Sequence, residues 1–179
     1  SRYCQKLMID MGYKITQNEK MQTGFYCDYG NDKGPTLALR CDLDALPIEE
    51  VNAIDYCSIN KGVSHACGHD SHMANILGVA AYIVETKQNI PGTVRFIFQP
   101  AEEGPPEGEE GGAELMVKEG VLKNPNVDAV FGLHVSSNLL VNKVAYKPGG
   151  VLASATSFEI KIKGRQAHGS APWAGADPI

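Results

Sequence analysis

The sequence of 179 residues predicts an α/β protein in which helices cover both faces of a sheet. Two observations predict this fold class. Short apolar runs typical of buried strands alternate with longer runs of helical periodicity, and segments containing Gly and Pro separate them. The side chains best suited to chemistry also lie where strand-like runs end, as they do in layered α/β proteins.

The first half of the chain contains two helical patterns and two strand-like runs. Residues 2–13 have helical periodicity, and residues 21–29 and 36–43 are strand-like. The polar, Gly-containing segment between these strands, residues 30–35, predicts a hairpin turn. The apolar run that follows a Cys/His-rich segment predicts a helix over residues 70–86.

The second half continues the alternation and then changes its pattern. A buried strand is expected over residues 93–98, a helix over 113–119 and a second buried strand over 127–135. Residues 141–146 predict an edge strand. Residues 157–163 alternate apolar and charged side chains, which predicts a half-exposed strand of an antiparallel sheet.

This change of pattern predicts a domain boundary near Ser154. Residues 1–154 would form the α/β domain, and residues 155–179 would supply the first strand and loop of a smaller α+β domain. The chain begins within a helical pattern and ends in Asp177-Pro178-Ile179, a sequence typical of a helix start. We therefore expect a fragment of a longer protein.

Composition narrows the classes of function. The net charge of −5 and the absence of a Lys/Arg cluster predict no nucleic-acid partner. The longest nearly uncharged run, residues 71–84, is too short to cross a bilayer, so no membrane association is expected. Five cysteines without regular spacing do not suggest a disulfide framework, and they favour a reducing, cytoplasmic compartment.

A Cys/His-rich segment, residues 64–72, is the strongest chemical signal in the chain. Cys67 and His69 lie two residues apart before the predicted helix, and Gly68 between them permits a tight turn. Thiolate and imidazole are common ligands of divalent metals. The alternative is a buried cysteine beside a hydrogen-bonded core histidine.

Carboxylate pairs follow two of the predicted strands. Asp42 and Asp44 would share one face if the strand continued. Glu102 and Glu103 would point to opposite sides in extended backbone, so that one could bind a metal while the other reaches a metal-bound water. The alternative for the glutamates is a solvated acidic loop.

Two further histidines are candidates. His134 lies on an apolar run, where most single histidines belong to the core, but Cys67, His69 and a glutamate would require further ligands. His168 lies in a loop flanked by glycine and could donate a hydrogen bond to a developing oxyanion, or it could be a surface residue without a role.

A thiol hydrolase is the rival mechanism. Cys67 could act as a nucleophile with His69 or His65 as its base. Residues two apart rarely reach that geometry, and Glu102 and Glu103 would then have no function. The sequence contains neither a Gly-x-Ser-x-Gly elbow nor a Walker-type phosphate loop.

Taken together, five segments closely resemble the metal-dependent aminoacylase/carboxypeptidase family of amidohydrolases. The most similar branch contains auxin-conjugate hydrolases, hippurate hydrolases and N-acetyldiaminopimelate deacetylases. The resemblance extends from about residue 37 to residue 179, and the segments in order are residues 40–47, 65–70, 98–104, 132–134 and 164–169.

The resemblance implies a layered α/β/α metallohydrolase catalytic domain followed by the start of a lid and dimerisation domain. It also implies that a pair of divalent ions (Zn, Mn, Co or Ni) is bound by four residues: Cys67, His69, Glu103 and His134. Glu102 would be the general base toward a water that bridges the metals.

Further roles are implied outside the metal ligands. Asp42 and Asp44 would orient ligands or water from behind, and His168 would polarise the scissile carbonyl in the partner subunit of a homodimer. The expected activity is hydrolysis of the amide bond of a small N-acyl amino acid. In the family the last metal-ligand histidine lies beyond Ile179, so we expect this chain alone to be weakly active or inactive. A non-catalytic metal-binding fragment is the remaining alternative.

Overall fold

The computed structural model describes residues 1–21, 23–31, 33–152 and 158–179. These residues form two compact units, Ser1–Ser137 and Asn138–Ile179. Ser154, near which the sequence predicts a domain boundary, lies outside the described residues. The division into domains of residues 1–154 and 155–179 stays a prediction.

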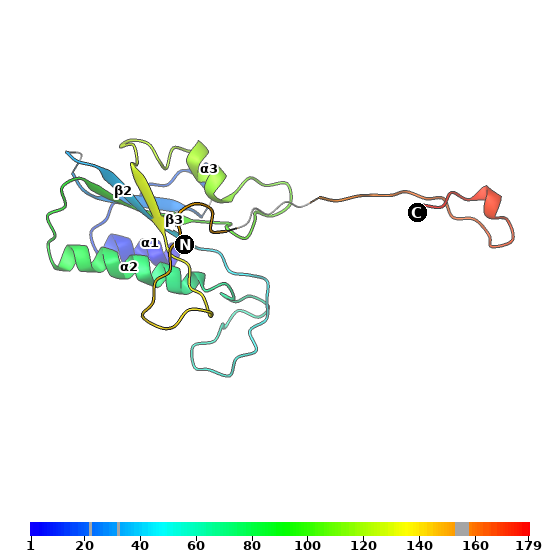
Figure 1. Ribbon diagram of the computed structural model, residues 1–179, viewed down its shortest axis with the longest axis horizontal. Coiled ribbons are helices and arrows are strands. Elements are labelled where there is room, and N and C mark those ends of the chain that lie inside the picture. The colour runs from blue at the N-terminus through cyan, green and yellow to red at the C-terminus, as the bar shows by residue number, and fades with distance from the viewer. Residues whose placement is uncertain (22, 32, 153–157) are drawn as a thin grey trace. The chain divides into compact units, whose positions relative to one another are not determined.

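The first unit consists of alternating helices and strands, with one 3₁₀ turn (Figure 1). The three predicted helices and the four principal predicted strands are all present in this unit, with shifted ends. In chain order the elements are α1 (Arg2–Asp10), η1 (Glu19–Met21), β1 (Phe25–Gly30), β2 (Thr36–Asp42), α2 (His69–Glu85), β3 (Thr93–Gln99), α3 (Gly112–Lys118) and β4 (Ala129–Gly132).

The four strands form one mixed sheet in the order β1-β3-β2-β4. β2 pairs in parallel with both β3 and β4, whereas β1 pairs antiparallel with β3. The predicted hairpin between β1 and β2 is therefore wrong, because β3 lies between them. β3 is buried along nearly its whole length, and an interior position covers such a strand better than an edge position does.

Helices lie on both faces of the sheet, as the sequence predicts. α1 and α2 cover one face and α3 covers the other (Figure 1). Side chains of β3 alternate between the two layers: Phe96 and Phe98 belong to the core under α1 and α2, and Ile97 packs with Met116 of α3. The result is a three-layered α/β/α unit.

A buried arginine on β3 connects the sheet to the segment that follows α3. Arg95 is fully buried, and its guanidinium donates two hydrogen bonds of 2.8 Å to the carboxylate of Asp28 on β1. It also lies over the ring of Tyr26 at 4.5 Å. Its remaining hydrogen bonds go to backbone carbonyls of the segment after α3, those of Val121, Lys123 and Asn124.

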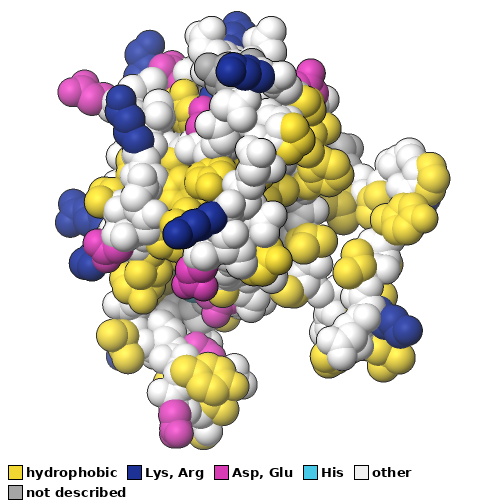
Figure 2. Space-filling view, turned by 90° about the vertical axis from the view of Figure 1, so that its left-hand side faces the viewer, with side chains coloured by type: hydrophobic (Ala, Val, Ile, Leu, Met, Phe, Trp, Pro, Cys, Tyr) yellow, Lys and Arg dark blue, Asp and Glu magenta, His cyan; other side chains and the backbone are white. Residues whose placement is uncertain are grey.

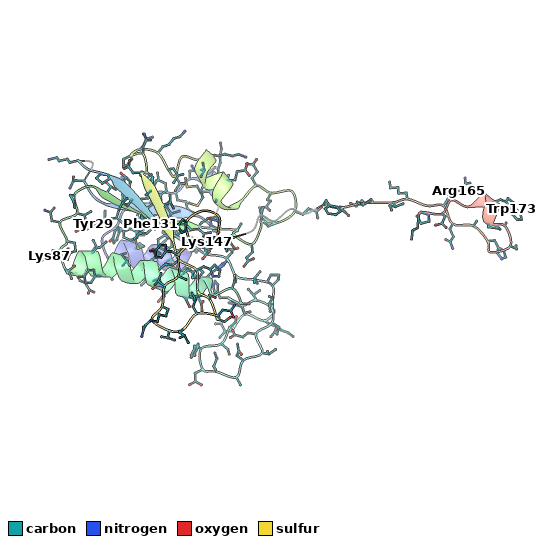
Figure 3. All side chains as sticks on the ribbon, in the orientation of Figure 1. Tyr29, Lys87, Phe131, Lys147, Arg165 and Trp173 are labelled. Atoms are coloured by element: carbon teal, nitrogen blue, oxygen red, sulfur yellow. The ribbon has the colours of Figure 1, made fainter. Side chains whose placement is uncertain are left out.

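β4 differs from the strand that the sequence predicts over residues 127–135. It is shorter, and it is half-buried to exposed rather than buried. Among the described residues it pairs only with β2, which leaves its other edge open. The side chains of Val130 and Phe131 are exposed; Figure 3 labels Phe131.

Two strands predicted from the later sequence are not formed in the described residues. Residues 141–146 and 158–163 have no strand hydrogen bonding, and their side chains are exposed. An alternating sequence becomes a strand only where a neighbouring strand takes its hydrogen bonds, and no described segment pairs with either run. These two predictions are corrected for the described residues.

The second unit is small and closed by one bridge. Arg165 and Ala176 exchange backbone hydrogen bonds of 2.8 and 2.9 Å around the 3₁₀ helix η2 (Pro172–Ala174). Trp173, on η2, is exposed (Figure 3).

Charged side chains of both signs are mixed on the surface. Figure 2 shows Lys and Arg side chains interspersed with Asp and Glu on the face in view, without a large patch of one sign. No helix among the described residues has the length and apolar character needed to span a membrane.

Candidate metal centre

The candidate residues of the first unit gather at the carboxyl ends of the parallel strands. β2 ends at Asp42, which is in register with Gln99 at the end of β3, and β4 ends at Gly132 just before His134. α2 begins at His69. Three strand ends and one helix start thus converge on one edge of the sheet, the usual position of sites in α/β folds.

His69 is the central residue of this cluster and is 1% exposed. Its Nδ1 lies 2.8 Å from the backbone oxygen of Asp44, so Nδ1 carries the proton and donates it. Nε2 therefore presents a lone pair, and it is buried without a hydrogen-bond partner. Oxygen atoms of Glu102 and Glu103 lie 3.8 and 3.7 Å from this nitrogen.

Cys67 and His134 complete the cluster around His69. The Sγ of Cys67 lies 3.4 Å from the Nε2 of His134. The Nδ1 of His134 lies 2.6 Å from the backbone oxygen of Val135, so His134 also presents Nε2 as a lone pair. A hydrogen bond to the Glu103 carboxylate, together with burial, raises the pKa of the Cys67 thiol to about 11.

The donor atoms fit a divalent metal. Cys67, His69 and His134 each offer one atom, and these atoms lie within 4.8 Å of one another; the same holds for His69, Glu102 and Glu103. Thiolate, imidazole and carboxylate form a typical donor set for zinc and related ions. A cation would satisfy the unpartnered Nε2 of His69 and compensate the nearby carboxylates. His69 belongs to both groups and offers one ligand atom, Nε2.

The two glutamates are arranged differently from the sequence-based expectation. The backbone is not extended here: Ala101 has a positive φ of 49°, which turns the chain after β3. Both carboxylates face the same nitrogen of His69 rather than opposite sides. The backbone N–H of Glu103 donates to Asp44 Oδ2 at 2.9 Å, which fixes the loop against the end of β2.

The two aspartates predicted to orient ligands or water both lie beside His69. Asp42 is fully buried, and its Oδ2 accepts a hydrogen bond of 2.8 Å from Arg40 while lying 3.7 Å from His69 Nε2. Burial alone would raise the pKa of Asp42, but the hydrogen bond from His72 and the charge of Arg40 lower it below its ordinary value. Asp44 holds His69 through its backbone oxygen and Glu103 through its side chain.

His72 is the residue that the sequence reasoning did not assign. It is 2% exposed, and its Nδ1 lies 2.6 Å from Asp42 Oδ1. Its position three residues after His69 on α2 is the available signal, since side chains three apart share a helix face.

His168 lies in the second unit, where its Nδ1 is 2.8 Å from the hydroxyl of Ser170. Its predicted role toward the scissile carbonyl stays a prediction.

Comparison with known proteins agrees with this geometry. Residues 38–178 match the model of peptidase family M20/M25/M40. The chain is 47% identical over 150 residues to thermostable carboxypeptidase 2 of Saccharolobus solfataricus, covering 84% of this chain and 37% of that protein. It is 39% identical over 178 residues to N-acetyl-L-cysteine deacetylase of Bacillus subtilis, covering 99% and 41%.

A solved structure shares the fold. The Bacillus subtilis YXEP protein, described as a dinuclear metal-binding peptidase of the M20 family, superposes with a TM-score of 0.68 at 37% identity. The match covers 77% of this chain and 37% of that one. The chain thus spans less than half the length of the relatives it matches.

Proposed function

The chain belongs to peptidase family M20/M25/M40, and from this premise we propose that it carries the metal-binding and proton-transferring part of an amidohydrolase for N-acyl amino acids. One observation carries the proposal. The Nε2 of His69 is buried without a partner, and one thiol, one further imidazole and two carboxylates lie around it. The match to the family model confirms the resemblance found in the sequence, whereas the substrate and the individual roles are proposed.

Cys67, His69, Glu103 and His134 would hold the metals. A pair of divalent cations at such a site (Zn²⁺, Mn²⁺, Co²⁺ or Ni²⁺) would lower the pKa of a water molecule and polarise the amide carbonyl. The two histidines are prepared for this role because both Nδ1 protons are engaged by backbone oxygens, which orients both Nε2 atoms into the cluster.

Glu102 would be the general base. Its carboxylate lies 3.8 Å from His69 Nε2 and is partly exposed, so a water molecule beside the metals could reach it. It takes a proton from the attacking water as the new C–O bond forms. It then delivers that proton to the amide nitrogen as the C–N bond breaks, giving a carboxylate and a free amine.

The substrate class and the partner are supported by the relatives. One of them is named a deacetylase of N-acetyl-L-cysteine, and another is named a carboxypeptidase. We extend to this protein an N-acylated amino acid as substrate and a homodimer in which His168 of one subunit polarises the carbonyl bound by the other.

Replacement of the base tests this assignment. In a protein of the relatives' full length, Glu102→Gln should lower kcat about 10²–10⁴-fold toward N-acetyl amino acids, because the proton acceptor is lost. Metal content measured by mass spectrometry should not change. Glu107→Gln, which neutralises an exposed glutamate of the same loop, is the matched control and should keep full activity. Unchanged kcat in the Glu102→Gln variant would remove this residue from its role.

A thiol hydrolase is the second candidate, because His134 lies within 3.4 Å of the Cys67 thiol. The chemistry of the thiol disfavours it, since a nucleophilic cysteine requires a lowered pKa and the Glu103 carboxylate raises that of Cys67. Dialysis against a chelator separates the two mechanisms. A metalloenzyme loses activity and recovers it with Mn²⁺ or Zn²⁺, whereas a thiol enzyme keeps it. A full-length protein without activity on any N-acyl amino acid would favour the non-catalytic alternative.

A further inference from the structure

We infer that His72 is a positioning residue that fastens the segment carrying His134 to helix α2 and thereby sets the separation between His134 and Cys67. The inference rests on the proposed function, because it assigns a supporting role to a residue behind the proposed ligands. It concerns a side chain that contacts neither substrate nor metal.

Both ring nitrogens of His72 are engaged. Nε2 lies 3.0 Å from the backbone nitrogen of Val135, and because a backbone N–H can only donate, Nε2 is the acceptor. Nδ1 therefore carries the proton and donates it to Asp42 at 2.6 Å. His72 thus has no lone pair left for a metal, although it lies within ligand distance of Asp42 and His69.

Val135 connects His72 to the proposed metal ligands. Its backbone N–H is held by His72, and its backbone oxygen accepts the Nδ1 proton of His134. Its side chain packs on the backbone between Cys67 and His69, since a Cβ added at Gly68 would lie 2.4 Å from Val135 Cγ2. One residue thus connects α2, the His134 ring and the Cys67–His69 turn.

Apolar packing alone fixes this segment incompletely. A cavity of about 350 Å³ lies between α2 and β4, lined among others by Ile76, Val79, Phe131 and Leu133. β4 is short and paired on one side among the described residues. His72 also lines this cavity, and its hydrogen bond from the Val135 N–H ties the segment after β4 to α2. His72 thus bridges Val135 and Asp42 through its two ring nitrogens. The Asp42 end of this bridge is rigid, because Asp42 is buried and accepts a hydrogen bond from Arg40.

The ring of His72 also contacts the ring of His134, with centroids 4.6 Å apart and planes at 67°. If the bond to Val135 is lost, the His134 ring is no longer held opposite Cys67. Outer partners of metal ligands typically change metal affinity by about 10–100-fold when they are removed. We expect an effect of this size.

Two amide substitutions separate the two halves of the bridge. In His72→Gln the amide can occupy the position of Nε2 and accept the Val135 N–H, but it gives up the bond to Asp42. In His72→Asn the amide can occupy the position of Nδ1 and donate to Asp42, but it does not reach Val135. The inference predicts Co²⁺ affinity within a few-fold of the unmodified chain for His72→Gln, and about 10–100-fold weaker binding for His72→Asn.

Two measurements and one control variant distinguish a loss of positioning by His72 from a general loss of folding stability. Co²⁺ titration of the chain reports the thiolate-to-cobalt charge-transfer band, which requires Cys67 at the metal. Amide hydrogen exchange at Val135 in the metal-free chain should be faster in His72→Asn than in His72→Gln. Ile83→Ala, which opens the core beneath α2 away from the site, should lower the unfolding free energy and leave the band unchanged.

The outcomes distinguish the inference from the proposed function. Equal Co²⁺ affinity and equal Val135 exchange in the two variants would overturn the role of His72. If the unmodified chain gives no charge-transfer band, the proposed metal site is wrong, and the exchange rates at Val135 still decide whether His72 holds this segment.

Discussion

Hydrogen bonds to backbone oxygens determine which nitrogen each ligand histidine offers. His69 donates from Nδ1 to Asp44, and His134 donates from Nδ1 to Val135. Both rings therefore have the same tautomer, with Nε2 unprotonated; that of His69 has no hydrogen-bond partner, and that of His134 lies 3.4 Å from the Cys67 sulfur. His72 has the same proton on Nδ1, but its Nε2 is used by Val135. The same tautomer thus occurs in the two proposed metal ligands and in a histidine that accepts a backbone hydrogen bond. The group that lies next to Nε2 determines which of these roles the histidine has.

Lowering the pH should reduce the unfolding free energy of the metal-free chain, because Asp42 becomes protonated. Its pKa in the folded state lies below the ordinary value, so the folded chain binds fewer protons than the unfolded chain. Its contribution to stability is therefore full above the ordinary pKa and is lost as pH falls through the folded value. Urea unfolding between about pH 6 and about pH 3 should show a smaller pH dependence for Asp42→Asn than for the unmodified chain. Identical pH dependence would contradict this origin.

Gly68 should tolerate no side chain. Its φ of +81° disfavours other residues, and an added Cβ would meet Val135 Cγ2 at 2.4 Å. Gly120 has a similar φ of +85° with no atom within 4 Å, so Gly120→Ala carries only the backbone strain, about 1–2 kcal/mol.

Gly68→Ala should therefore lower the unfolding free energy more than Gly120→Ala does, and it should also weaken Co²⁺ binding. Adding Val135→Ala to Gly68→Ala should recover part of both losses. Equal losses in the two alanine variants would show that the contact with Val135 does not matter.

At the scale of elements, local patterns predicted the helices and most strands but not strand order. The turn-forming residues between β1 and β2 indicated a hairpin. Which strands pair, however, depends on which strand is apolar on both faces and therefore takes an interior position in the sheet. β3 meets that condition and lies between them. Residues 158–163 alternate apolar and charged side chains as a strand should. They form no strand because pairing depends on a neighbouring segment, which a local pattern does not contain.

Arg95 should be the residue whose loss most disturbs the arrangement of these elements. Arg95→Met removes the donors for Asp28 and for three backbone oxygens after α3, so unfolding free energy should fall by about 3 kcal/mol. Chemical denaturation measures this loss. Lys118→Met, which removes exposed ion pairs on α3, should have little effect. A similarly small effect of Arg95→Met would mean that apolar packing alone holds this segment.

At the scale of the whole molecule, the sequence predicted the donor types but not their separation. Cys67 and His69 could be recognised from their spacing, and Glu102, Glu103 and His134 from their places after strands. Both glutamates face His69 because the chain turns at Ala101, which has a positive φ. The local sequence does not predict this turn. His72 was missed because its task comes from Val135, a residue 63 positions away.

Metal binding should stabilise the first unit as a whole, because the donors come from segments that unfolding separates. Free Zn²⁺ at about 100 times its Kd should raise the unfolding free energy by about 2.7 kcal/mol. Thermal melts with and without chelator measure the gain. Cys67→Ala should show a smaller gain at the same zinc concentration, and no gain in the unmodified chain would argue against a bound ion.

Another strand could add to the sheet at the open edge of β4. Backbone groups on that side can accept another strand without breaking a bond already made, whereas β2 and β3 have partners on both sides. A strand added parallel to β4 would end at the same edge as β2, β3 and β4. The loop after it would then deliver its side chains to the metal centre, so an extension of the sheet is also a means of supplying another ligand.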